Sequence, residues 1–431
     1  MIQMDNPNIV ITGLGLVTSL GRNVSENWRN LEQKKTGIGR YPREGQPQSF
    51  DYIGKAADCS MPEGVTRKMQ SQTKFLNRGS LLGFLAAHEA VTSSHVELSR
   101  VPPDRRALVL GSGDHTKTGY EFLFPAVIQG TNKEFGQVNS RRLNEACLTQ
   151  VNPFYLLESL HNNLFSFLSA FFQFKGPNLS LASLSPCGLH ALEAASRMIR
   201  QGQADMALVV GCGNWITEIP LYELEGLGLL SRCREGAESF RPLDRRRNGF
   251  IPGEGGAALL LEPEGSARER GAFIDARISG MGNCIEFDSA HSLRVSRSVS
   301  LRCMALALKS AAVDASDLGF ISPHGNATRM GDRSELESIE MLLGNRASQT
   351  PIVAMKPYTG HMGAASDIAE IVLGVQGMRK GMAPATLNFR AAEERFSHLQ
   401  ISDTHLPCDR NRFLSVSCGM GGQVASALVE V

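Results

Sequence analysis

The sequence L-A-S-L-S-P-C-G-L-H, residues Leu181–His190, marks the point where an apolar segment gives way to a helix. The apolar segment ends at Ser185, and apolar residues then recur at helical spacing over 189–199. Proline is favoured at the first helical position, so Pro186 predicts that Ser185 is the N-cap. A side chain there faces free N–H groups and the positive end of the helix dipole, which suits an activated nucleophile or an acyl oxyanion.

Ser185 also admits a purely structural interpretation, because serine is among the best N-cap residues. In that interpretation its hydroxyl oxygen only accepts the N–H of Cys187 or Gly188 and takes no part in chemistry. The stretch alone leaves both interpretations open, and the rest of the chain has to decide between them.

The fold class follows from short apolar runs that end in glycine-rich turns. Ile9–Ile11 leads into T-G-L-G, Leu108–Leu110 into G-S-G and Leu208–Val210 into G-C-G, and Ile278 and Phe413–Val416 precede similar turns. Continuous apolar runs with helical patterns between them indicate strands buried on both faces of an α/β layer structure. The helical patterns lie near 67–95, 153–174, 186–201, 299–313, 332–343 and 364–380.

Two related halves are predicted from a repeated pattern. The sequence I-T-G-L-G near the start of the chain corresponds to I-S-G-M-G at 278–282, beyond a charged segment at Pro263–Gly271. We therefore expect one compact α/β body in which residues 1–262 and 263–431 each contain a mixed five-stranded sheet between helices. The first half would carry Ser185, and the second half would carry the candidate histidines.

Composition argues against several classes of protein. The 431 residues are 42% hydrophobic and 20% charged with a net charge of +1, which gives no reason to expect nucleic acid as a partner. The longest aromatic and apolar run, 164–174, is too short to cross a bilayer, so no membrane contact is expected. Nine cysteines without a C-x-x-C pair indicate reduced thiols and a cytoplasmic location, and the ten histidines show no metal-ligand spacing.

Two segments of the second half place polar groups between glycines directly after apolar runs. Phe320–Ile321 leads to P-H-G-N-A-T with His324, and 352–354 leads to M-K-P-Y-T-G-H-M-G with Lys356 and His361. A single histidine beside glycine is usually structural. Two histidines and a lysine at strand ends of one sheet are typical of a functional site, because ligands collect at such ends in open α/β sheets.

These segments belong to a longer set of motifs that is spread over nearly the whole chain. The motifs are T-G-L-G-L-V-T-S-L-G (12–21), W-R-N-L (28–31), T-G-I-G (36–39), N-P-F (152–154), F-K-G-P (174–177), R-P-L-D-R-R-R-N-G-F-I-P-G-E-G-G (241–256), H-G-N-A-T-R-M-G-D (324–332) and K-P-Y-T-G-H (356–361). With them the chain resembles the β-ketoacyl–acyl carrier protein synthases, the elongating condensing enzymes of bacterial fatty acid and type II polyketide synthesis. The resemblance implies the thiolase fold, with two related halves layered as α-β-α-β-α.

The resemblance also implies roles for individual residues. In the family a cysteine at a helix N-terminus accepts the acyl chain, and that position falls on Ser185. The two histidines that bind the malonyl thioester oxygen and assist loss of carbon dioxide fall on His324 and His361. The family's lysine and its glutamate partner fall on Lys356 and Glu370, which we expect to form an ion pair. One thioester has to touch the serine and both histidines, so these three are expected to converge.

The main departure from the family is the nucleophile, because a serine hydroxyl has no ionised fraction comparable to that of a thiol and needs a general base within hydrogen-bond reach. Cys187 does not simply replace it, since two positions rotate a helical side chain by roughly 200°. The family's H-G-T is H-G-N here, and its gating phenylalanine is a cysteine. The residues that the resemblance places in the substrate-binding site are Phe250, Asn326, Thr328, Cys418, Met420 and Asp114.

Two functions of different classes fit this pattern. The first is a condensing acyltransferase, or a malonyl-carrier decarboxylase, in which Ser185 replaces the cysteine and His324 or His361 acts as its base. The second is a subunit similar to a chain-length factor, which lacks the cysteine and shapes the pocket of an active ketosynthase. The altered nucleophile and gate favour the second function, whereas the complete set of histidines, lysine and glutamate favours the first.

An acyl carrier protein is the partner that the resemblance implies, in a homodimer or in a heterodimer with a cysteine-containing ketosynthase. We expect carrier docking at the basic pair Arg67 and Lys68, which also fits a solvated helix end. No cofactor of the chain's own is expected, because 4′-phosphopantetheine arrives on the carrier protein.

Overall fold

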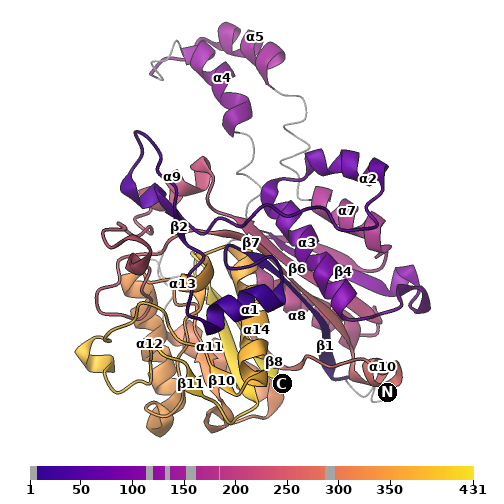
Figure 1. The fold of residues 1–431 in the computed structure, drawn as a ribbon, viewed down its shortest axis with the longest axis vertical. Helices are drawn as coiled ribbons and strands as arrows, with labels where there is room; N and C mark the ends of the chain where they lie inside the picture. The colour runs from indigo at the N-terminus through magenta and orange to yellow at the C-terminus, as the bar shows by residue number, and fades with distance from the viewer. Residues whose placement is uncertain (1–6, 113–119, 132–135, 152–161, 184, 287–296) are drawn as a thin grey trace.

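A nine-stranded mixed sheet runs through the centre of the molecule (Figure 1), in the order β5-β4-β6-β7-β1-β8-β13-β12-β9. The computed structural model describes the chain except residues 1–6, 113–119, 132–135, 152–161, 184 and 287–296. Asp114 and the N-P-F motif therefore lie outside the described residues. The sheet divides into two halves between β1 and β8, which pair over only three residues, from Ile9 to Ile11.

The first half of the sheet has five strands. Its three parallel strands, β5, β4 and β6, are followed by β7 and β1, each antiparallel to its neighbour. Apart from the outermost strand, the residues of these strands are buried almost without interruption, as their continuous apolar runs predict. The strands are β1 (Ile9–Thr18), β4 (Arg106–Ser112), β5 (Asn178–Ala182), β6 (Met206–Asn214) and β7 (Glu254–Pro263).

The second half repeats this arrangement with β8 (Ala276–Ile285), β13 (Gln423–Glu430), β12 (Arg412–Cys418) and β9 (Phe320–Ser322). The first three are antiparallel neighbours, and β9 is parallel to β12. The place that corresponds to β5 is taken by one parallel bridge, between Ile321 and Ile352. The α/β fold with two related halves is thus confirmed, while the division of the chain near residue 262 stays a prediction.

Helices form three layers around the two halves of the sheet, which gives the α-β-α-β-α order (Figure 1). The middle layer lies between the halves and takes one helix from each of them, α8 and α14. Almost all of α14 is buried, because strands of both halves contact it. The outer layers are α3 (Arg78–Ser93) with α7 (Asn162–Phe172), and α11 (Arg297–Ala311) with α12 (Arg329–Leu343); the middle helices are α8 (Cys187–Arg200) and α14 (Ala364–Arg379).

The glycines of the first motif allow an outer helix to approach the sheet closely. A Cβ atom on Gly15 would lie 1.8 Å from the carbonyl oxygen of Ala86 in α3, and one on Gly13 would lie 2.0 Å from that of Ala90. No side chain fits at such distances. The T-G-L-G sequence in β1 is therefore explained by packing of the strand against α3.

The single helical pattern predicted near 67–95 is two helices, α2 (Arg67–Gln72) and α3. The break occurs because the Asn77 side chain accepts the N–H of Ser80 and begins a new helix. The sequence patterns did not predict the remaining elements. These are α1 (Val24–Glu32), α4 (Tyr120–Thr131), α5 (Ser140–Gln150), α9 (Glu218–Gly226), α10 (Glu264–Glu269), α13 (Lys356–Thr359), β2 (Gly39–Arg40), β3 (Tyr52–Ile53), β10 (Met382–Ala383) and β11 (Leu406–Pro407).

Helices α4 and α5 pack on each other and project away from the rest of the molecule (Figure 1). Their loops connect to parts of the chain outside the described residues. Over the described residues, no helix combines the length and the hydropathy that crossing a bilayer would require.

Candidate active site

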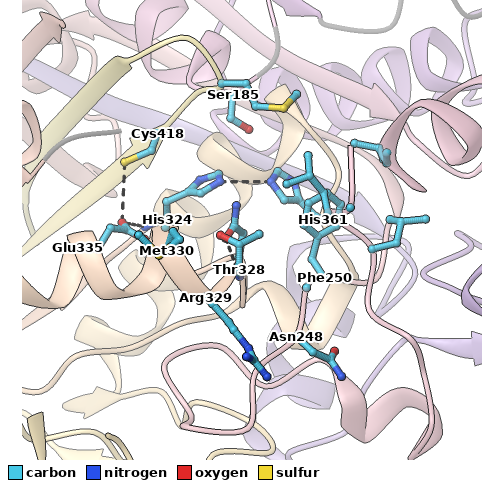
Figure 2. Close-up of a pocket in the computed structure, with 18 of the residues that line it drawn as sticks. Ser185, Asn248, Phe250, His324, Thr328, Arg329, Met330, Glu335, His361 and Cys418 are labelled. Atoms are coloured by element: carbon cyan, nitrogen blue, oxygen red, sulfur yellow. Dashed lines mark hydrogen bonds between the residues drawn. The ribbon is translucent and has the colours of Figure 1, made fainter. Parts of the chain in front are cut away.

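A cavity of about 970 Å³ brings together side chains from both halves of the molecule. Figure 2 shows Ser185 at one end of it, His324 and His361 next, and Asn248 and Arg329 toward the other end. The convergence expected of the serine and the two histidines is observed. Every described residue that was predicted to bind substrate also lines this cavity, namely Phe250, Asn326, Thr328, Cys418 and Met420.

Ser185 does not cap helix α8, so the N-cap prediction is wrong. The helix begins at Cys187, with Pro186 in the cap position and no side-chain cap from either residue. The N–H of Gly188 instead donates to the carboxylate of Asp367 in α14, at 3.0 Å. Ser185 is 3% exposed, and its hydroxyl has no hydrogen-bond partner among the described residues. The capping group thus comes from the other half of the molecule and leaves the serine hydroxyl free.

Two thiols occur near this segment or in the cavity, and neither is placed as an ionised nucleophile. Cys187 is buried outside the cavity lining, and its Sγ donates to the carbonyl oxygen of Leu181 at 3.3 Å. Cys418 lines the cavity with its Sγ 3.9 Å from the Glu335 carboxylate. Burial, together with that carboxylate, raises the pKa of the Cys418 thiol well above its usual value. Ser185 therefore remains the candidate nucleophile.

The two histidines approach each other through their outer ring nitrogens, with Nε2 to Nε2 at 3.4 Å. His324 follows β9, and His361 follows α13. Burial and the Lys356 charge lower the pKa of both rings well below 6.5, so both are neutral at physiological pH. The Nδ1 atom of His361 accepts the N–H of Gly363 at 3.2 Å. The Nε2 atom of His361 therefore carries the proton and serves as a hydrogen-bond donor.

The expected ion pair between Lys356 and Glu370 is present, with Nζ 2.8 Å from Oε1. Both side chains are almost fully buried. Burial raises the pKa of Glu370 to about 7, while the Lys356 charge opposes that change. The ammonium also donates to the carbonyl oxygen of His324 at 2.6 Å. The pair therefore joins the segment that carries Lys356 and His361 to the loop that carries His324.

Aromatic rings hold His361 in place. The ring centroid of Trp215 lies 4.6 Å from that of His361 in a stacked arrangement, and the ring of Phe250 lies 4.8 Å away. Trp215 was not predicted as a site residue, although it directly follows β6, whose last residues include the G-C-G sequence. Asn326 is tied to its own loop, because its Oδ1 accepts both the N–H and the hydroxyl of Thr328.

Three further polar groups near the histidines were missed from the sequence. The Glu335 carboxylate accepts the N–H groups of His324 and Gly325 at 2.7 and 2.9 Å, and burial raises its pKa to about 8. Asp367 and Ser417 are fully buried and hydrogen-bonded to each other. Glu335 and Asp367 could have been noticed in the sequence as carboxylates within predicted helical patterns. A buried carboxylate lowers stability unless it has a hydrogen-bond partner, so such a position suggests a specific contact.

Basic residues line the cavity at positions that were not predicted from the sequence. Arg67 and Lys68 lie on α2 with exposed side chains, outside the cavity lining, and their role stays a prediction. No cluster of three potential metal ligands occurs within the described ranges. The arginines that line the cavity are Arg232, Arg234, Arg246 and Arg329.

The chain is similar to known proteins along most of its length. Residues 6–267 match the family described as "Beta-ketoacyl synthase, N-terminal domain", and residues 276–390 match "Beta-ketoacyl synthase, C-terminal domain". Among curated proteins, "3-oxoacyl-[acyl-carrier-protein] synthase 2" of Vibrio cholerae is 27% identical over 91% of each chain.

Solved structures show the same fold. The ketosynthase of a type II PKS, AntDE:AntF, solved with its acyl-carrier protein, aligns with a TM-score of 0.82 and 22% identity over 99% of this chain and 100% of its own. The ishigamide ketosynthase/chain length factor aligns with a TM-score of 0.81 and 21% identity over 99% of each chain. The likeness at this level of identity establishes a thiolase-like ketosynthase fold. Because both family descriptions match and together cover most of the sequence, the chain belongs to the beta-ketoacyl synthase family.

Proposed function

We propose that this chain is a β-ketoacyl–acyl carrier protein synthase that uses Ser185 as its acyl acceptor. Its substrates would be acyl and malonyl thioesters of fatty acid or type II polyketide synthesis. The observation that carries the proposal is the buried Ser185 hydroxyl, which has no partner among the described residues and shares a cavity with two neutral imidazoles. Buried polar atoms nearly always have a partner, so a substrate group is the natural one here.

In the first step the acyl group would move from the carrier thioester to Ser185. The Nε2 atom of His324 takes the hydroxyl proton, and the bond between Ser185 Oγ and the acyl carbon forms. The carbon–sulfur bond of the thioester then breaks, and the leaving thiolate receives the proton from His324. This role requires His324 to hold a lone pair on Nε2, which a neutral ring is able to do.

In the second step a malonyl thioester would lose carbon dioxide. The electron pair of the broken carbon–carbon bond forms an enolate, whose oxygen accepts the Nε2–H of His361. The enolate carbon attacks the acyl carbon on Ser185, and the serine oxygen leaves with a proton that His324 relays from solvent. The Lys356–Glu370 pair supports both steps by fixing the backbone of His324.

The relatives and the charge of the cavity support the same substrate class. The curated relative from Vibrio cholerae is named "3-oxoacyl-[acyl-carrier-protein] synthase 2". Three of the cavity arginines, Arg232, Arg234 and Arg329, are exposed at its rim. Guanidinium groups there fit an acidic carrier surface and the phosphate of its prosthetic arm.

A non-acylating partner subunit is the second candidate. It is favoured by the serine at the nucleophile position and by the fold likeness to a structure of a ketosynthase and chain length factor. Strand β5 ends the sheet with mostly exposed residues, and Leu179 is 36% exposed, so this edge is open to pairing with a second subunit. The second subunit would be a cysteine-containing ketosynthase in this case and a second copy of the chain in the first.

Mass spectrometry of the protein after incubation with an acyl–acyl carrier protein tests the proposal. We expect an ester on the peptide that contains Ser185, no ester in Ser185→Ala, and a faster reaction in Ser185→Cys. If Ser185→Cys is acylated and the wild-type serine is not, the proposal fails and the partner-subunit function stands. If both proteins stay unmodified, the cavity does not admit the acyl chain and the proposal fails as well.

A further inference from the structure

We propose that Asp367 and Ser417 position His324 as the base for Ser185, by fixing the imidazole proton on Nδ1 and leaving a lone pair on Nε2. This inference rests on the proposed function and names two positioning residues for it. Asp367 lies in α14 and Ser417 lies in β12, so the arrangement exists only in the folded chain.

The Asp367 carboxylate joins the histidine side of the cavity to the nucleophile side. Its Oδ1 accepts the hydroxyl of Ser417 at 2.6 Å, and its Oδ2 accepts the N–H of Gly188 at 3.0 Å. Gly188 is the second residue of α8, three positions after Ser185. One fully buried carboxylate thus holds both the helix that follows the serine and the hydroxyl beside the histidine.

The Oγ atom of Ser417 lies 3.5 Å from Nδ1 of His324. The direction of the Ser417 proton decides whether that nitrogen faces a hydrogen-bond donor or an acceptor. A hydroxyl has one proton, and that of Ser417 is donated to Asp367. Its oxygen therefore faces the imidazole as an acceptor, and a neutral ring places its own proton on Nδ1 in response.

The opposite side of the ring agrees with this assignment. His361 carries its proton on Nε2, because its Nδ1 is occupied by the N–H of Gly363. At 3.4 Å, that Nε2–H faces the Nε2 atom of His324, which accepts it only if His324 has no proton there. In the acylation step the Ser185 hydroxyl would replace His361 as the donor to this lone pair, which leaves the His361 Nε2–H for the substrate. The donors and acceptors from Asp367 to His361 are then matched throughout.

Other charged groups near His324 form hydrogen bonds with its backbone, whereas Ser417 contacts its imidazole ring. Lys356 donates to the His324 carbonyl oxygen, and Glu335 accepts the His324 N–H. Burial raises the pKa of Asp367, and the hydrogen bond from Ser417 and the Lys356 charge oppose that rise. Among the described residues, Ser417 is the group that hydrogen-bonds to the His324 ring at Nδ1.

The arrangement would supply the oriented general base that a serine nucleophile needs and a cysteine thiolate does not. When Ser185 gives its proton to His324 Nε2, the ring becomes an imidazolium with protons on both nitrogens. Its Nδ1–H then donates to Ser417, whose proton is held by the Asp367 carboxylate, so the new positive charge is stabilised. No proton has to leave this chain of groups until the thiolate departs.

The variant Asp367→Asn tests the inference. Its amide oxygen still accepts the Gly188 N–H, but its amide nitrogen donates to Ser417, which turns the Ser417 proton toward His324 Nδ1. The His324 proton then moves to Nε2, and acylation of Ser185 falls by about 100-fold or more. Decarboxylation of a malonyl thioester falls less than tenfold, because His324 now offers a donor to the enolate oxygen. Nitrogen-15 NMR of labelled histidine reports the change of tautomer directly.

Two serines of β12 provide a matched pair of variants. Ser417→Ala removes the contact with His324 and leaves the bond between Asp367 and Gly188 intact, so we expect it to lose acylation as Asp367→Asn does. Ser415→Ala removes a buried hydroxyl on the same face of the strand that has no partner among the described residues, and we expect no effect. Equal acylation in Ser417→Ala and wild type would overturn the inference.

The two proposals fail in different ways. If wild-type Ser185 is acylated but the nitrogen-15 spectrum of His324 is the same in wild type and Asp367→Asn, the positioning role is wrong and the proposed function stands. If the spectrum shows Nδ1–H in wild type and Nε2–H in Asp367→Asn while Ser185 never becomes acylated, the positioning role is right and the proposed function is wrong.

Discussion

At the scale of single residues, a buried hydroxyl without a hydrogen-bond partner lowers the stability of the folded state. Ser185, at one end of the cavity, has such a hydroxyl. We therefore expect Ser185→Ala to leave the free energy of unfolding unchanged or to raise it by up to about 1 kcal/mol. A capping serine would instead lose about 0.5–2 kcal/mol on the same change. Urea denaturation measures the difference.

The matched control for this prediction is Asn77→Ala, which removes a real cap. The Asn77 side chain accepts the N–H of Ser80 at 2.8 Å at the start of α3. We expect this variant to lose about 1 kcal/mol. A loss in Ser185→Ala as large as that in Asn77→Ala would contradict the assignment of the α8 cap to Asp367.

The Lys356–Glu370 pair gives a second prediction at this scale. Glu370→Gln leaves a buried ammonium without its counter-charge, and we expect it to lower the free energy of unfolding by about 3–5 kcal/mol. Replacing both residues, as in Lys356→Met with Glu370→Leu, should recover part of the loss, because no isolated charge then remains. Denaturant unfolding of Lys356→Met, Glu370→Leu and the double variant measures this coupling. A double variant as unstable as the sum of the singles would show that the pair does not interact.

Individual residues were predictable where a short motif carries them. His324, Lys356 and His361 follow apolar runs within a few positions, so the segments that hold them could be located in the sequence. His324 follows strand β9 as predicted, whereas the run before Lys356 forms one bridge, at Ile352, and Lys356 begins α13. Asp367 and Ser417 were not predictable, because partners of theirs lie in other segments, on α8 and in the loop after β9. No local pattern of the sequence marks a contact between α14 and the start of α8.

At the scale of elements, the packing of β1 against α3 depends on glycine. A Cβ atom at position 15 would lie 1.8 Å from the carbonyl oxygen of Ala86. We expect Gly15→Ala to destabilise the protein by more than about 3 kcal/mol, because strand and helix backbones would have to separate. Yield of folded protein and its melting temperature measure the effect.

Gly265 in α10 is the control for that substitution. No atom lies within 4 Å of a Cβ built there, and its backbone is helical. We expect Gly265→Ala to raise stability by about 0.5–1 kcal/mol, since alanine loses less conformational entropy in a helix. If Gly15→Ala lowers stability no more than Gly265→Ala does, β1 and α3 do not approach each other as closely as described.

Glu89 joins three elements and gives a prediction about pH. From α3 its carboxylate accepts the N–H of Leu16 in β1 at 2.9 Å and that of Val24 in α1 at 2.8 Å. Burial raises its pKa from 4.5 to about 7. Between these values the folded state holds a proton that the unfolded state has released, so the free energy of unfolding falls as pH rises from about 4.5 to about 7.

Urea denaturation of wild type and Glu89→Gln at several values of pH from 5 to 8 isolates this contribution. We expect the difference in stability between the two proteins to shift in favour of Glu89→Gln as the pH rises. A difference that stays constant over this range would show that the pKa of Glu89 is not raised.

Element boundaries were predictable from the sequence where the apolar pattern begins and ends with the helix. The patterns near 299–313 and 364–380 correspond closely to α11 and α14. The start of α8 was misplaced because its cap, Asp367, comes from a helix far along the chain. The break between α2 and α3 was missed although the Asn77 cap is local, because the apolar pattern continues across it.

At the scale of the whole molecule, a net charge of +1 provides no long-range attraction for an acidic carrier protein, so the proposed function requires local clusters of basic residues for docking. We expect the double variant Arg232→Glu with Arg234→Glu to raise KM for a carrier-bound acyl group at least tenfold. KM for the same acyl group on a short thiol without a carrier should change little. Steady-state kinetics at low and high salt measures both.

Charge reversal at Arg67 and Lys68 is the comparison for this prediction. These residues are exposed on α2, and the resemblance to the family selected them from the sequence. A larger rise in KM from this pair than from the arginines at the cavity rim would place carrier docking on α2. No change from either pair would mean that the carrier docks elsewhere.

The repeated strand order has a consequence for the history of the chain. The order β1-β7-β6-β4-β5 recurs as β8-β13-β12-β9 with the bridge at Ile352, which is the trace that duplication of one ancestral half would leave. The segment after β5 now holds Ser185, and its counterpart after Ile352 holds Lys356 and His361. Duplication would thus have allowed one ancestral segment to diverge into the Ser185 segment in one copy and the Lys356–His361 segment in the other. An ancestor made of a single half could have assembled such a site only by pairing with itself.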